Sequence, residues 1–237
     1  MKTFGLIGKK LSHSFSQHYF QEKFFKENIK DCQYLNFELE ELENLSELIT
    51  KKNITGLNIT IPFKESIVPF LDKITNEAKK IGAVNTIEIK GEKIIGHNTD
   101  VLGFEKSFLQ VVGERNNAII LGNGGASKTI QYVLQRNNIN YLVASRNSDF
   151  TIKQIDKNIL QQYDIIINST PLGMHPDVSS FPYLPYEFIN TKHLLFDLVY
   201  NPEQTIFLAN GKANGAQIKN GKQMLHLQAE ESWKIWN

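Results

Sequence analysis

Short apolar runs alternate with amphipathic stretches along the chain, and their spacing predicts both strands and helices. In the first part, strands are predicted at 3–8, 33–39, 54–61, 83–89 and 93–96, and helices at 16–29, 40–51 and 64–71. A helix at 101–112 leads into a second part, where strands are predicted at 118–121, 141–145, 164–168, 193–199 and 216–219. The tail at 223–236 is amphipathic and predicts a closing helix. Regular alternation of strand and helix in the second part is typical of βαβ units with a parallel sheet.

A glycine-rich turn follows the first strand of the second part. The apolar run 118–121 leads into Gly122, Gly124, Gly125 and Ala126, and a helix is predicted at 128–136. Glycines let the backbone approach a pyrophosphate closely, and the helix N-terminus offers free N–H groups and the positive end of the helix dipole. This strand–turn–helix context predicts a dinucleotide-binding domain in the second part.

The order of the elements predicts an α/β protein with two lobes. We expect an N-terminal α/β substrate-binding and catalytic lobe at 1–100, joined by the C-terminal helix 223–237, and a Rossmann-like dinucleotide-binding domain with a parallel sheet at 101–222. Open parallel sheets bind ligands outside the carboxyl ends of their strands, so we also expect a cleft between the two lobes.

The end of the second strand in this domain indicates which nucleotide is bound. NAD-binding domains carry an acidic residue there, which hydrogen-bonds the ribose 2′-hydroxyl. This chain instead has Ser145, Arg146 and Asn147. A guanidinium and hydroxyl groups suit a 2′-phosphate, which favours NADP. The alternative is an arginine that contacts only solvent.

Composition argues against several classes of function. The chain of 237 residues has a formal net charge of +1. It therefore lacks the excess of positive charge that is typical of proteins that bind nucleic acid or a membrane surface. Cys32 is the only cysteine, so no intrachain disulfide can form and a reducing compartment fits best. The N-terminal apolar run is too short for a signal peptide or a membrane span, and we expect a cytoplasmic protein. The histidines form no i,i+4 pair of the zinc-binding kind, so we predict no metal site.

Two polar segments near the N-terminus are candidates for ligand binding. On extended backbone Ser14 and Ser16 point the same way, and their hydroxyls can donate to a carboxylate; an ordinary turn or helix N-cap is the alternative. Asn58 and Thr60 share one face of a predicted strand. Lys64 follows the end of that strand, where active sites of α/β folds collect, although an exposed lysine is the commoner state.

Two further polar segments lie before the second part. Asn85 interrupts an apolar strand, a position that burial alone explains poorly. Asp100 directly precedes the helix at 101–112. It is either the N-cap of that helix or a carboxylate at the cleft.

Taken in order, these segments resemble a known family. The patterns are Gly-x-Asn-x-Thr-x-Pro-x-Lys at 56–64, Gly-Ala-Val-Asn-Thr at 82–86, Asn-Thr-Asp at 98–100, the glycine loop at 122–126, Asp-Leu-Val-Tyr-x-Pro at 197–202 and Gly-x-x-Met-Leu-x-x-Gln at 221–228. They cover nearly the whole chain and resemble the NADP-dependent shikimate dehydrogenases of the shikimate/quinate dehydrogenase family. The resemblance implies reversible, NADPH-dependent reduction of 3-dehydroshikimate to shikimate, a step of chorismate and aromatic amino acid biosynthesis.

The resemblance also implies a role for individual residues. Lys64 and Asp100 would be the catalytic pair, with Lys64 as general acid and base. The carboxylate and hydroxyls of shikimate would be held by Ser14, Ser16, Asn58, Thr60, Asn85, Tyr200 and Gln228. The cofactor would be bound by Gly122, Gly124, Gly125, Ala126, Ser145, Arg146, Asn147, Leu198 and Gly221.

Two other functions remain open at the level of sequence. One is a quinate/shikimate dehydrogenase that uses NAD, against which the missing acidic residue after 141–144 argues. The other is a non-catalytic ligand-binding relative, which would be expected to lose Lys64 or Asp100, and both are present. The expected partner is a small-molecule substrate, with no nucleic acid and no membrane, and the chain is expected to be a monomer or a homodimer.

Overall fold

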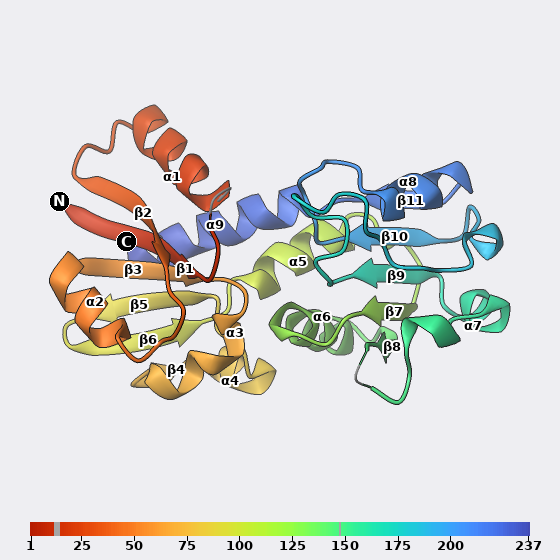
Figure 1. The fold of residues 1–237 in the computed structure, drawn as a ribbon, viewed down its shortest axis with the longest axis horizontal. Coiled ribbons are helices and arrows are strands. Elements are labelled where there is room, and N and C mark those ends of the chain that lie inside the picture. The colour runs from red at the N-terminus through yellow and green to blue at the C-terminus, as the bar shows by residue number, and fades with distance from the viewer. Residues whose placement is uncertain (12–14, 147) are drawn as a thin grey trace. The chain divides into compact units, whose positions relative to one another are not determined.

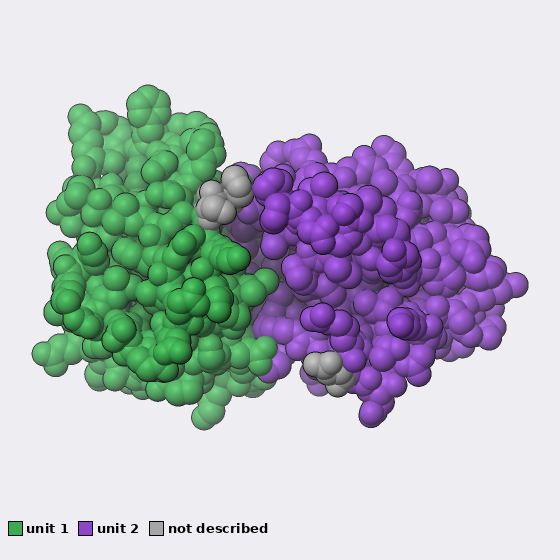
Figure 2. All heavy atoms as spheres, viewed as in Figure 1, with its two compact units in different colours: residues 1–99, 229–237 green, residues 100–228 purple. Residues whose placement is uncertain are grey.

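A computed structural model describes residues 1–11, 15–146 and 148–237. They form two compact units (Figure 2). Unit 1 contains Met1–Thr99 and Ala229–Asn237, and unit 2 contains Asp100–Gln228. The chain therefore enters unit 2 at the first residue of helix α5 (Asp100–Leu109) and returns to unit 1 inside helix α9 (Lys222–Trp236).

Unit 1 is built on a six-stranded mixed sheet in the order β2-β1-β3-β5-β6-β4 (Figure 1). The strands are β1 (Lys2–Gly8), β2 (Cys32–Glu38), β3 (Ile54–Ile59), β4 (Lys73–Ile74), β5 (Thr86–Lys90) and β6 (Lys93–His97). Strand β1 pairs in parallel with β2 and β3, whereas β5 pairs antiparallel with β3 and β6. Gly91 has a φ of +63° in the tight turn between β5 and β6, a conformation that glycine adopts readily.

Side chains of β1 alternate between two apolar layers of unit 1. Phe4 and Leu6 pack with helix α1 (Phe15–Lys26) and with the end of α9. Ile7 faces the other layer, which is covered by α2 (Leu45–Lys52), α3 (Phe63–Ser66) and α4 (Asn76–Ile81). The alternation is what a strand with both faces buried requires. The C-terminal end of α9 thus completes the core of the N-terminal unit.

Unit 2 is built on a five-stranded, fully parallel sheet in the order β11-β10-β9-β7-β8 (Figure 1). Its strands are β7 (Asn117–Leu121), β8 (Asn140–Ala144), β9 (Ile165–Asn168), β10 (Leu194–Asp197) and β11 (Gln217–Lys219). Leu195 packs in a core with α7 (Lys157–Gln162) and α8 (Ile206–Ala213), whereas Phe196 contacts Phe104 of α5. Helix α6 (Gly125–Arg136) packs beside α5. The predicted α/β class with a Rossmann-like parallel sheet is confirmed.

Several boundaries differ from the predicted elements. Helix α2 begins at Leu45, five residues later than predicted, although Leu42 is buried as the apolar pattern requires. The predicted helix at 64–71 is split into α3 and a 3-10 turn at Val68–Phe70, because Pro69 cannot donate a backbone hydrogen bond. The short elements β4, α4 and α8 have too few residues for a clear period and were not predicted. None of the described helices combines the length and the apolar character needed to cross a membrane.

Candidate active site

The glycine turn of unit 2 links β7 to α6 at the carboxyl edge of the parallel sheet. Gly122 has a φ of +107°, and a Cβ built there would lie 2.8 Å from the hydroxyl oxygen of Ser169. Gly124 is the N-cap of α6 and is exposed, and a Cβ added to it would meet no described heavy atom within 4 Å. The amides of Gly125 and Ala126 open the helix. An open space at the positive end of a helix fits a pyrophosphate.

The turn after β8 contains two described residues of the predicted set, Ser145 and Arg146, and only Arg146 is exposed. Ser145 is 9% exposed, and its hydroxyl donates to the Ser148 hydroxyl across 3.0 Å. Arg146 is exposed, and within the described part of the chain no residue bonds its guanidinium. Because the proton of Ser145 is already used, Arg146 is the stronger donor for a phosphate at this turn. Asn147 lies outside the described residues.

The segment after β10 folds back against the residue before α9. A Cβ at Gly221 would overlap the carbonyl oxygen of Leu198, so only glycine fits this approach. The Gly221 amide donates to the Val199 carbonyl across 3.1 Å. The structure therefore brings Leu198 and Gly221 together, and Tyr200 follows two residues after Leu198, half-buried.

Asp197 organises that segment, and sequence reasoning assigned it no role. Its carboxylate is 0% exposed and accepts hydrogen bonds from the Val199 amide, the Asn168 side chain and the Thr205 hydroxyl. Burial raises the pKa of Asp197 to about 6, even though these three hydrogen bonds favour the charged form. An acidic residue inside the apolar run 193–199 was the available signal.

In unit 1 the segments 56–64 and 82–86 lie side by side. The Ile59 amide donates to the Asn85 carbonyl at 2.8 Å, and the Val84 amide donates to the Lys64 carbonyl at 2.7 Å. Lys64 is half-buried in α3, directly beyond the strand end where it was predicted. Thr60 is half-buried one residue after β3.

Asn85 fixes the backbone just before α5. Its side-chain oxygen accepts from the Thr99 amide at 2.7 Å, and its side-chain nitrogen donates to the Thr99 hydroxyl at 3.0 Å. Asp100 comes next, as the first helical residue of α5, and is 1% exposed. It belongs to unit 2, as do Tyr200 and Gln228, whereas Lys64, Asn58 and Asn85 belong to unit 1.

A buried hydrogen-bond network surrounds Asn58. The Tyr34 hydroxyl donates to the Asn58 side-chain oxygen at 2.8 Å and is also hydrogen-bonded to the Ser16 side chain. The Asn58 side-chain nitrogen lies 2.8 Å from the Ser232 hydroxyl and 3.1 Å from the Thr86 hydroxyl. Ser16 and Asn58, two predicted ligand residues, thus meet at one phenol oxygen.

The structure corrects the prediction for Ser16. Ser16 lies in the first turn of α1, so the extended backbone assumed for it is wrong; the aromatic helical period begins at Phe15. Ser14 lies outside the described residues. Tyr34 and Ser232 were not predicted, because nothing in their local sequence separates them from ordinary core or surface positions. Thr86 ends the motif at 82–86 but was given no role of its own.

Comparison with known proteins identifies the family of the chain. Residues 6–87 match the family model described as the shikimate dehydrogenase substrate binding domain. A shikimate dehydrogenase (NADP(+)) of Clostridium beijerinckii is 39% identical over 251 residues, covering 100% of this chain and 92% of that protein.

Solved structures give the same result. A shikimate dehydrogenase structure from Peptoclostridium difficile has a TM-score of 0.88 at 37% identity, covering 100% of this chain and 91% of that one. A shikimate 5-dehydrogenase from Thermus thermophilus, solved in complex with NADP(H) and shikimate, has a TM-score of 0.88 at 27% identity, covering 100% and 94%. The chain therefore belongs to the shikimate dehydrogenase family.

Proposed function

We propose that this protein is an NADP-dependent shikimate dehydrogenase, an oxidoreductase that reversibly reduces 3-dehydroshikimate to shikimate in chorismate and aromatic amino acid biosynthesis. The observation that carries the proposal is the end-to-end match to a relative named shikimate dehydrogenase (NADP(+)), with 39% identity over all of this chain. The polar residues that the motifs single out are all present in this chain.

The proposed substrate-binding domain corresponds to 1–100 with the C-terminal helix 223–237, and the NADP-binding domain to 101–222. Shikimate is held by Ser14, Ser16, Asn58, Thr60, Asn85, Tyr200 and Gln228. NADP is held by Gly122, Gly124, Gly125, Ala126, Ser145, Arg146, Asn147, Leu198 and Gly221. Support for the second set comes from the open space at Gly124, from the helix N-terminus of α6 and from the guanidinium of Arg146, which no described residue bonds.

Lys64 is the proposed acid–base residue. When bound, NADPH supplies the hydride that reduces the carbonyl carbon of 3-dehydroshikimate. The Lys64 ammonium gives a proton to the carbonyl oxygen, and in the reverse direction the neutral amine takes the proton from the shikimate hydroxyl. Asp100 is the second member of the proposed catalytic pair.

A quinate dehydrogenase that uses NAD is not favoured. The turn after β8 carries Arg146 where NAD-binding domains place an acidic residue, and curated relatives similar over the full chain are named for NADP(+). A non-catalytic relative is not favoured either, because Lys64 and Asp100 are both present. The single cysteine supports a cytoplasmic enzyme, which we take to be a monomer or a homodimer.

One assay with one variant tests the function. The purified protein should reduce NADP⁺ when shikimate is added, with much lower kcat/KM for NAD⁺ or for quinate. Lys64→Ala should lower kcat by about 10²–10⁴-fold while shikimate still raises its Tm, because the lost group transfers a proton and does not dominate binding. Wild-type protein without shikimate-dependent activity would refute the function, and near-normal turnover of Lys64→Ala would refute only the role of Lys64.

A further inference from the structure

We propose that Tyr34 and Ser232 are positioning residues that hold the side chains of Asn58 and Ser16 in the orientation that binds shikimate. The inference rests on the proposed function. Neither residue belongs to the set that the motifs single out, and both reach Asn58 from elements remote in sequence, β2 and the C-terminal end of α9. All four side chains belong to unit 1.

The directions of the hydrogen bonds around Asn58 follow from donor and acceptor types. The Asn58 side-chain nitrogen points to the Asn85 carbonyl, 3.4 Å away, which can only accept. The opposite side-chain atom is therefore the oxygen, and the Tyr34 hydroxyl must donate to it. Because a phenol has one proton, the hydrogen bond between Tyr34 and Ser16 must be donated by the Ser16 hydroxyl.

Ser232 closes the other side of the amide. Its hydroxyl oxygen is 2.8 Å from the Asn58 side-chain nitrogen and 2.9 Å from the Thr86 hydroxyl, and Ser232 and Thr86 are each 0% exposed. Rotation of the Asn58 amide by half a turn would place its nitrogen against the Tyr34 hydroxyl and its oxygen against the Asn85 carbonyl, two acceptors facing each other. The network therefore specifies one orientation.

Packing keeps Tyr34 in place. Its side chain is 1% exposed, and its ring stacks on Phe20 with centroids 4.5 Å apart. Burial raises the pKa of Tyr34 far above the neutral range, so the hydroxyl keeps its proton and remains a donor to Asn58. The ring can therefore be preserved in a variant that removes only the hydroxyl.

Because each hydroxyl has a single proton, the network also predicts how the Ser16 hydroxyl reorients when shikimate binds. In the structure the Ser16 proton is directed to Tyr34. To donate to the shikimate carboxylate, the Ser16 hydroxyl must turn away from Tyr34, while the Tyr34 bond to Asn58 stays intact. Tyr34 thus keeps the Ser16 hydroxyl close to the proposed substrate position by accepting a hydrogen bond from it. The proton of the Tyr34 hydroxyl remains committed to Asn58.

Tyr34→Phe is the decisive variant, with Tyr186→Phe as a matched control. Tyr186 donates to the Pro182 carbonyl in unit 2 and touches none of the proposed site residues through that bond. We expect Tyr34→Phe to raise the KM for shikimate about 5–10-fold, the effect of one lost hydrogen bond, with kcat and the KM for NADP⁺ within about twofold of wild type. Tyr186→Phe should leave all three constants within about twofold.

Ser232→Ala provides a second reading that does not depend on how well Tyr34→Phe folds. It should raise the KM for shikimate by a similar factor, again without a matching fall in kcat. If wild type oxidises shikimate and both variants bind it normally, or if their only change is a lower Tm, Tyr34 and Ser232 are purely structural and the inference is overturned. If wild type shows no activity with shikimate, the proposed function fails and the inference falls with it.

Discussion

Arg146 differs from the two other arginines of the chain in what its guanidinium contacts. Arg115 donates to the Lys192 carbonyl and Arg136 pairs with Glu105, whereas no residue of the described part bonds Arg146. A solvent-facing guanidinium after β8 is available for a phosphate without breaking any bond that stabilises the fold. We therefore expect selectivity between NADP and NAD to depend mainly on the Arg146 side chain.

Arg146→Ala should raise the KM for NADP⁺ by about 10–100-fold, because it removes charge-assisted hydrogen bonds to the 2′-phosphate. The KM for NAD⁺ should change little. Arg136→Ala is the control: it loses an ion pair with Glu105 on the same unit and should leave both KM values unaltered. Steady-state kinetics with both cofactors checks this, and equal losses for the two cofactors would rule out a 2′-phosphate contact.

Asp197 should make the stability of the protein depend on pH in the opposite direction to most carboxylates. Its pKa is raised from 3.8 to about 6 in the folded protein, so between these values the folded state binds a proton that the unfolded state has released. Its contribution is fully present below pH 3.8 and is lost as pH rises through about 6, a change of about 3 kcal/mol. Urea unfolding across this range should show the loss in wild type, relative to Asp197→Asn. Identical pH dependence of the two proteins would contradict the assignment.

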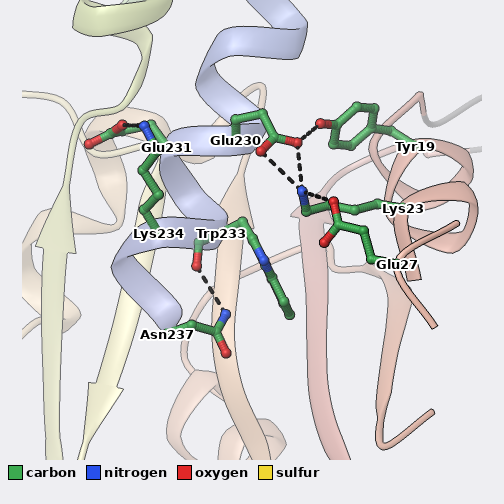
Figure 3. A network of polar contacts seen from close by, with 8 residues as sticks. All are labelled: Tyr19, Lys23, Glu27, Glu230, Glu231, Trp233, Lys234 and Asn237. Carbon is green, nitrogen blue, oxygen red and sulfur yellow. Dashed lines mark hydrogen bonds and ion pairs between the residues drawn. The ribbon is translucent and has the colours of Figure 1, made fainter. Parts of the chain in front are cut away.

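At the scale of elements, a cluster of hydrogen bonds and ion pairs joins the end of α9 to α1 (Figure 3). The Glu230 carboxylate accepts from the Tyr19 hydroxyl and from the Lys23 ammonium, which lies 2.9 Å away and also pairs with Glu27. The Lys23 side chain is only 9% exposed. Trp236 adds a bond from its indole N–H to the Ile87 carbonyl at 2.9 Å. These contacts hold in place the helix that carries Ser232.

Lys23 and Lys26 allow a matched comparison on one helix. Each forms an ion pair with a glutamate one turn away, Glu27 and Glu22 respectively, but only Lys23 also reaches α9. Lys23→Ala should lower the free energy of unfolding by about 1–2 kcal/mol, and Lys26→Ala, which loses only an exposed pair, by clearly less. Urea denaturation of both variants measures this. A loss of the same size at both positions would mean that the contact with Glu230 adds nothing.

The elements themselves were predictable to different degrees. Strands β7 and β9 and helix α6 were predictable, because their apolar patterns indicate burial without reference to any particular packing partner. The start of α2 was not predictable, because Leu42 fits the helical apolar pattern and is buried, yet it lies in the non-helical segment before α2. Helix α4 depends on its N-cap, since the Thr75 side chain accepts from the Ala78 amide across 3.3 Å.

At the scale of the whole molecule, the main protection by each ligand should fall in a different unit. NADP⁺ alone should slow hydrogen exchange of the amides at 122–126 in unit 2, because the proposed pyrophosphate site lies at these N–H groups. Shikimate alone should slow amides at 58–64 and 85–86 in unit 1. Mass spectrometry of peptides from these segments checks both. If shikimate slowed exchange only in unit 2, the assignment of the substrate-binding domain to unit 1 would be contradicted.

The sequence by itself determined the α/β class, the parallel sheet, the glycine turn and the family, because period, glycine requirement and motif are local properties of the chain. Only the tertiary structure decided which polar side chains form hydrogen bonds with one another. Asn58 and Ser232 are 174 residues apart, and their hydrogen bond exists because α9 returns to the sheet of unit 1. The carboxyl of Asp197 acquires its raised pKa for the same reason: burial is set by the packing of distant segments, which no local pattern records.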